Sequence, residues 1–122
     1  MDKFISKYYD GYEGEPNIQF IKESIDGERT VLSLWSGYFD DIMHQFEPAA
    51  SGWVGLAYYY HLAIGWEEEI WEIPDPCMAL TEFKSVNSDK LRFDESSNVL
   101  SAICDLIASA IEGKCKMWIN KD

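Results

Sequence analysis

The side chains that most often act as nucleophiles and proton carriers in enzymes are few in this sequence and stand far apart. There are two histidines, His44 and His61, and three cysteines, Cys77, Cys104 and Cys115. Nucleophilic catalysis needs a Ser or Cys beside a base such as His, with a carboxylate to orient that base, and no nucleophile-elbow motif is present. We therefore expect that the chain is not an enzyme.

Metal and cofactor chemistry has little support in the sequence. A carboxylate three or four residues before a histidine can bind a metal from one face of a helix, and Asp40, Asp41 and His44 have this spacing. One such group supplies too few ligands, and with 22 acidic residues in 122 an acid near a histidine is expected by chance. The glycines of segment 52–55 lack the lysine and the flanking pattern of a phosphate loop. We predict no metal and no cofactor.

The cysteines and the first residues bear on the cellular compartment. The three cysteines are widely spaced and form no Cys-x-x-Cys motif, which is typical of reduced thiols in a cytosolic protein. Because free cysteine behaves as a small apolar residue, we expect all three to be buried. Residues 1–10 lack the apolar stretch of a secretory signal. The expected location is therefore the cytoplasm.

Net charge and composition limit the classes of partner. The formal charge is −12, from 22 acidic and 10 basic residues, so nucleic acids and anionic membrane surfaces are electrostatically poor partners. The longest apolar run, 53–66, has fourteen residues and is shorter than the roughly 20 that a membrane-spanning helix needs. With 47% apolar residues and 18 aromatics, residues 1–122 should fold as one domain.

The negative charge is concentrated in one stretch, which we call the acidic segment. Residues 30–83 contain nine acids and no Lys or Arg, and so carry nine of the twelve net charges; they also contain eleven of the 18 aromatics. Acids interleaved with Trp and Tyr are typical of an interface for a cationic protein, since the acids steer the encounter and the aromatics supply contact area. The pattern leaves open that the aromatics form the core and the acids only coat it.

Within the acidic segment we predict the side chains that bind such a partner. The steering or pairing acids are Asp40, Asp41, Glu67, Glu68, Glu69, Glu72 and Asp75. The aromatic anchors are Tyr58, Tyr59, Trp66 and Trp71. The glutamates around Trp66 and Trp71 also allow a third hypothesis, an enzyme in which two carboxylates act as acid and base on a sugar; its test is a distance in space.

Apolar periodicity predicts the elements of secondary structure. The clearest is a helix over 99–111, where apolar residues recur at three- and four-residue steps, with N-cap candidates at 94, 96 and 97 and a stop at Gly113. The other predicted elements are helices at 3–9, 17–25, 38–46 and 75–86 and strands at 30–35 and 114–120, and Asp26-Gly27 is expected to end the helix at 17–25. Segment 53–66 leaves helix and strand open, because its three consecutive tyrosines favour a strand and its length and apolar spacing allow a helix; we favour the helix. Asp75 is the predicted N-cap of its helix. Together they predict an α+β domain with several helices packed on a small sheet.

Part of the acidic segment resembles a known family. The stretches that carry the resemblance are Gly52-Trp53-Val54-Gly55-Leu56-Ala57-Tyr58-Tyr59-Tyr60, Gly65-Trp66-Glu67-Glu68-Glu69 and Trp71-Glu72-Ile73-Pro74-Asp75. They resemble bacterial immunity proteins, small acidic proteins that neutralise polymorphic toxins, including those of contact-dependent growth inhibition. The resemblance implies a cytoplasmic inhibitor that binds the C-terminal toxin domain delivered by a neighbouring cell, commonly a basic nuclease, and blocks its active site or substrate surface.

A second hypothesis fits the residues almost as well. An acidic adaptor or regulatory subunit that binds a basic cellular protein, with no toxin involved, would show the same concentration of charge. Genome neighbourhood separates these two hypotheses. A pair of acids in a deep pocket would instead favour the enzyme.

Overall fold

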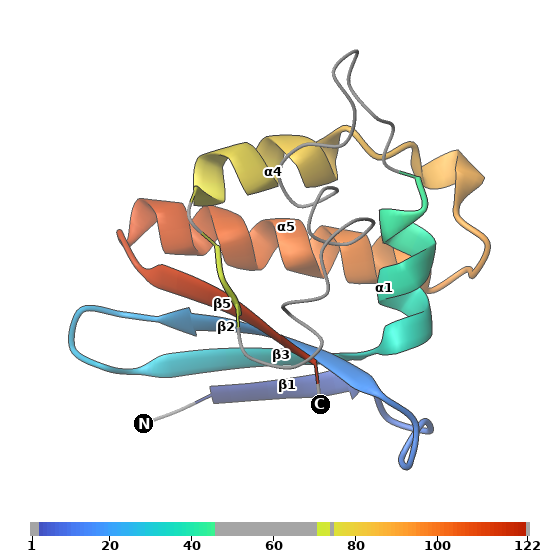
Figure 1. Ribbon diagram of the computed structural model, residues 1–122, viewed down its shortest axis with the longest axis horizontal. Coiled ribbons are helices and arrows are strands. Elements are labelled where there is room, and N and C mark those ends of the chain that lie inside the picture. The colour runs from blue at the N-terminus through green and yellow to red at the C-terminus, as the bar shows by residue number, and fades with distance from the viewer. Residues whose placement is uncertain (1–2, 46–70, 74, 122) are drawn as a thin grey trace.

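A five-stranded sheet in the order β1-β3-β2-β5-β4 organises the fold, and the described helices lie on one of its faces (Figure 1). The structure, a computed structural model, describes residues 3–45, 71–73 and 75–121. The strands are β1 (Lys3–Tyr8), β2 (Asn17–Glu23), β3 (Arg29–Trp35), β4 (Trp71–Glu72) and β5 (Lys116–Lys121). The helices are α1 (Ser36–Met43), α4 (Pro76–Lys84), α5 (Ser96–Glu112) and the short 3-10 helix η1 (Ser88–Lys90). The predicted α+β domain is confirmed.

Two helix predictions near the N-terminus are wrong, because segments 3–9 and 17–25 contain the strands β1 and β2. β2 pairs antiparallel with β3 on one side and with β5 on the other. Asp26-Gly27, expected to end a helix, lies instead in the turn of the β2–β3 hairpin, where Gly27 has a φ of +89°. Pairing along both edges outweighs the weak helical pattern of β2, and an Asp-Gly pair between two apolar runs is a hairpin signal.

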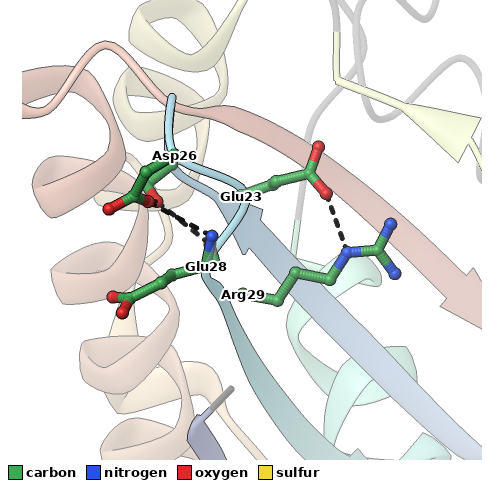
Figure 2. Close-up of polar contacts among 5 residues, drawn as sticks. Glu23, Asp26, Glu28 and Arg29 are labelled. Atoms are coloured by element: carbon green, nitrogen blue, oxygen red, sulfur yellow. Dashed lines mark hydrogen bonds and ion pairs between the residues drawn. The ribbon is translucent and has the colours of Figure 1, made fainter. Parts of the chain in front are cut away.

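Polar contacts within the hairpin turn hold its shape (Figure 2). The Asp26 carboxylate accepts hydrogen bonds from the Ser24 hydroxyl and from the backbone N of Glu28. These bonds, first the one from Ser24 and then the one from Glu28, favour the charged form and lower the pKa of Asp26 below its ordinary value. Across the base of the turn, Arg29 Nε donates to Glu23 Oε1 at 2.8 Å.

The other predicted elements within the described residues are confirmed. The strands predicted at 30–35 and 114–120 are β3 and β5, and the helices predicted at 38–46, 75–86 and 99–111 are α1, α4 and α5. Asp75 caps α4 as predicted, because its carboxylate accepts from the backbone N of Met78 at 3.1 Å. The segment 53–66 lies outside the described residues.

The core lies between the sheet and the helices. Phe20 of β2 is fully buried, and its ring packs edge to face against Phe39 of α1 and Phe83 of α4, with centroids 5.9 and 6.0 Å apart. α5 contributes Val99, Ile103, Leu106 and Ile107, and β5 contributes Met117 and Ile119. α4 packs on α5, and α5 contacts β2 and β5. Phe39 and Phe83, two aromatics of the acidic segment, are therefore core residues.

Candidate partner-binding surface

The eleven side chains predicted to bind a partner divide into those that the structure describes and those that it does not. Tyr58, Tyr59, Trp66, Glu67, Glu68 and Glu69 lie outside the described residues. Trp71 begins β4, where its backbone is opposite Ile119 of β5. The side chains of Asp40, Asp41, Glu72 and Asp75 are described, and they have different environments.

Asp41 has an internal role and not the surface role predicted for it. Its side chain is only 3% exposed, and its Oδ2 accepts from the backbone N of Arg92 at 2.8 Å, the backbone N of Phe93 at 3.1 Å and the Ser96 hydroxyl at 2.8 Å. α5 begins at Ser96, and its N-cap residue, Glu95, makes no side-chain cap hydrogen bond. Asp41 thus supplies a carboxylate to this helix end from α1. A buried, engaged carboxylate cannot steer a partner.

The three exposed acids form two groups. Glu72 lies on β4 at one edge of the sheet, and Asp75 follows at the N-terminal end of α4, where its carboxylate also caps the helix. Asp40 is exposed on α1. Figure 1 shows α1 beside the N-terminal end of α5 and well apart from β4. A partner that engages Glu72 and Asp75 therefore approaches the β4 edge of the molecule, whereas Asp40 marks a second side.

A cluster of aromatic rings at the β3–α1 junction was not predicted from the sequence. Tyr12 and Trp35 stack with centroids 4.4 Å apart, and Tyr38 meets both rings edge-on. Phe93, which is 39% exposed, packs edge-on against Trp35 and Tyr38. The three-residue spacing of Trp35 and Tyr38 at a strand–helix junction was the available signal. Tyr12 and Phe93 come from distant turns, so nothing in the sequence pattern joined them to this cluster.

A hollow of about 550 Å³ opens beside this aromatic cluster. It is lined by Lys7, Tyr8, Asp10, Tyr12, Tyr38, Glu95 and Asn98. The hydroxyl oxygens of Tyr12 and Tyr38 are 3.1 Å apart, and this hydrogen bond, with burial as the second cause, raises the pKa of Tyr38 to about 12. Tyr38 therefore stays neutral at physiological pH. Acids and tyrosine rings around one hollow suit a cationic side chain.

No protein-family model, curated protein or solved structure matches the chain. Charge and geometry are therefore the grounds for a function. Over the described part of the chain, no three His, Cys, Asp or Glu side chains are placed to hold a metal ion together. None of the helices described there is long and apolar enough to cross a membrane.

The described cysteines differ in exposure. All three are free thiols; Cys104 and Cys115 are half-buried, whereas Cys77 in the first turn of α4 is exposed. The expectation that all three are buried is thus wrong for Cys77, because α4 buries Ala79 and Phe83 and turns this position outward. Burial raises the pKa of the Cys104 thiol, so Cys104 is a poorer nucleophile at neutral pH than a free cysteine in water.

Proposed function

We propose that this chain is a cytoplasmic immunity protein that binds and neutralises a cognate toxin domain, with a basic nuclease as the class of toxin. The observation that carries the proposal is the acidic segment, 30–83, in which nine acids are accompanied by no Lys or Arg. Crowding charges of one sign costs stability through self-repulsion. A basic partner relieves this repulsion when it binds, and the relief favours the complex. An inhibitor needs such a stable complex with its target.

Inhibition by this chain requires only that it cover the toxin's active site or substrate surface. A nuclease cleft attracts phosphates, and an acidic surface offers it the same sign of charge. Exposed carboxylates such as Glu72 and Asp40 would steer the encounter, and steering of this kind raises association rates by about 10- to 1000-fold at low salt. Fast association suits an antidote, because the toxin acts as soon as it enters.

The aromatic cluster offers a place for close contact after the encounter. Tyr12 and Tyr38 line the hollow together with Asp10, Glu95 and Lys7, so its lining has a formal charge of −1, and Phe93 packs against Tyr38. An arginine or lysine of the toxin could enter this hollow, because aromatic faces and carboxylates both stabilise a cation. The resemblance of residues 52–75 to immunity proteins supports the toxin as partner in preference to another basic protein.

The first experiment is co-purification of this chain with the C-terminal domain of the large protein encoded immediately upstream. A growth test then compares cells that express that domain with and without the chain. A tight complex and rescue of growth are expected. A stable complex with a basic protein that is not toxic would refute immunity and favour the adaptor hypothesis. The absence of both a complex and rescue would also count against immunity and favour the adaptor.

Charge reversal tests the role of the acidic segment within that complex. Glu72→Lys changes an exposed acid of the segment, and Glu112→Lys makes the same change at an exposed acid at the C-terminal end of α5. We expect Glu72→Lys to slow association about three- to tenfold at low salt, with little effect of Glu112→Lys. Stopped-flow association rates at several salt concentrations measure this difference. Equal effects of the two variants would mean that only net charge matters.

A further inference from the structure

A cleft between β1 and α5 has a local charge opposite to that of the whole protein. Its volume is about 460 Å³. It is lined by Lys3, Ile5, Lys7, Tyr8, Lys22, Thr30, Leu32, Asn98, Ser101, Ala102, Asp105, Leu106 and Ser109. Three lysines and one aspartate give the lining a formal charge of +2, in a chain of net charge −12. We call this site the lysine cleft.

Strand register brings two of these lysines together. Lys3 of β1 is paired with Thr30 of β3, and Thr30 is paired with Lys22 of β2. Paired residues on adjacent strands project from the same face, so Lys3 and Lys22 stand two strands apart, roughly 10 Å between backbones. The next row, Ile5 with Leu32, lies on that same face and forms an apolar floor.

An irregularity in the pairing of β1 brings Tyr8 to the lysine cleft. Ile5 is paired with Leu32 and Tyr8 with Leu34, so three steps along β1 match two steps along β3. This bulge turns Tyr8 to the face of Ile5. The Lys7 ammonium lies over the Tyr8 ring, 5.1 Å from its centroid, and both side chains line the cleft.

The cleft places positive charge among neutral hydrogen-bonding groups. Lys22 is half-buried, and its Nζ donates to the Ser109 hydroxyl at 3.2 Å, a neutral partner. A charged group that is withdrawn from water gains most from a partner of opposite charge. The acid of the lining, Asp105, is exposed on α5. Hydroxyls of Thr30 and Ser101 add further hydrogen-bonding groups.

We propose that the lysine cleft binds a small molecule that carries a phosphate group on an apolar body. Lysine is a common phosphate ligand as a point charge, and Lys3, Lys7 and Lys22 all line the cleft. Its floor of Ile5 and Leu32 takes the apolar part. The volume falls within the roughly 300–1,000 Å³ of small-molecule sites. β1 and β4 are the two opposite edges of the sheet, so the cleft is separate from Glu72. It adjoins the hollow beside the aromatic cluster and shares Lys7, Tyr8 and Asn98 with it, whereas Lys3 and Lys22 line the cleft and not that hollow. The proposal does not rest on the immunity function.

The test is a titration of the full chain, followed by backbone amide resonances in NMR, with inorganic phosphate, phenyl phosphate and benzoate as probes. We expect phenyl phosphate to bind most tightly and to shift the resonances of Lys3, Tyr8 and Ser101. Lys22→Met and Lys3→Met keep the aliphatic part of the side chain and should each weaken binding by roughly tenfold or more, the size of a lost charge-assisted hydrogen bond. The matched control, Lys90→Met on η1, removes an exposed lysine outside the cleft and should change affinity less than about twofold.

Several results would overturn the proposal. These are shifts that do not saturate at the cleft residues, an equal loss of affinity in Lys90→Met, or benzoate that binds as tightly as phenyl phosphate. The amide spectrum of each variant shows directly whether it is folded, and Lys3, being exposed on an edge strand, provides a test that does not disturb the core. Toxin binding by Lys22→Met should remain unchanged, because Lys22 lines the cleft and not the adjoining hollow.

Discussion

Replacing Asp41 by alanine should destabilise the protein more than any other change of a single acid among the described residues. The carboxylate joins α1 to the start of α5 through the backbone N of Arg92, the backbone N of Phe93 and the Ser96 hydroxyl, at 2.8, 3.1 and 2.8 Å. Asp41→Ala leaves these donors without their acceptor. Both Asp41 and Ser96 are buried, so water cannot replace the lost bonds without entering the structure.

The magnitude follows from the number and type of these hydrogen bonds. A hydrogen bond to a charged group contributes about 1.5–3 kcal/mol. The three bonds share one oxygen and are not additive, so we expect a loss of about 3–5 kcal/mol from the free energy of unfolding. That is a large part of the roughly 5–15 kcal/mol that stabilises a typical domain. Asp41→Asn keeps a carbonyl oxygen but loses the charge, and should cost about 1–2 kcal/mol.

Urea unfolding followed by tryptophan fluorescence measures these changes. Asp40→Ala is the matched control, since it removes the neighbouring, exposed carboxylate of the same helix, and should change stability by no more than about 0.5–1 kcal/mol. Ser96→Ala removes one of the three donors. In the double variant Asp41→Ala with Ser96→Ala, the two effects should be coupled by about 0.5–3 kcal/mol, because the residues share a hydrogen bond.

The reasoning is refuted if Asp41→Ala costs no more than Asp40→Ala. Strict additivity of Asp41→Ala and Ser96→Ala would also contradict it. Amide hydrogen exchange gives an independent check, because the backbone N–H groups of Arg92 and Phe93 should lose protection in Asp41→Ala before the strands do.

Two further predictions concern the aromatic cluster. A Cβ added at Gly37 would lie 2.4 Å from atoms of the Trp35 ring, so Gly37→Ala should lower the free energy of unfolding by about 1–3 kcal/mol, measured by thermal unfolding. The control, Gly113→Ala, should cost less, because its nearest contact would be 3.1 Å away. Equal effects of the two variants would mean that Trp35 moves freely. Tyr12→Phe should lower the pKa of Tyr38 from about 12 toward its ordinary 10.0. A raised tyrosine pKa stabilises the fold below pH 10, and this stabilisation is lost as the pH rises toward 12. Tyr12→Phe should therefore lose less stability between pH 10 and 12 than the unsubstituted protein. If the absorbance titration of tyrosinate is the same in both proteins, the prediction is wrong.

The local sequence pattern was enough to predict the elements that bury one regular face. α5 buries one face against the sheet and α4, and its apolar residues recur with the period of a helix. β2 shows where pattern was insufficient. Ile18 and Phe20 alternate as a strand requires, but Ile21 is also buried, so the same residues fit part of a helical face. Only pairing with β3 and β5, which lies far along the chain, decides between them.

The predicted partner-binding acids show the same limit of prediction from local sequence. Asp41 had the same type and nearly the same position as exposed Asp40, and its burial depends on Ser96, 55 residues later. A step of one residue along α1, roughly 100° around the helix axis, separates an exposed carboxylate from one directed into the protein. Sequence identifies the acidic segment, but the contacts that bury one acid and leave the next exposed are formed by residues outside it.

The lysine cleft could not be seen in the sequence, because residues 1–29 appear nearly balanced, with seven acids and four bases. The fold separates these charges. Lys3, Lys7 and Lys22 lie on β1 and β2, whereas Asp10, Glu13, Glu15, Asp26 and Glu28 lie in the turns. Glu23, the acid on β2, forms an ion pair with Arg29. Register then places Lys3 and Lys22 in one row across Thr30. A sheet with lysines at its β1 edge and Glu72 at its β4 edge can present opposite charges to two different ligands. The net charge of −12 therefore describes the protein only at a distance of many ångströms, and binding at each edge is governed by the local set of side chains.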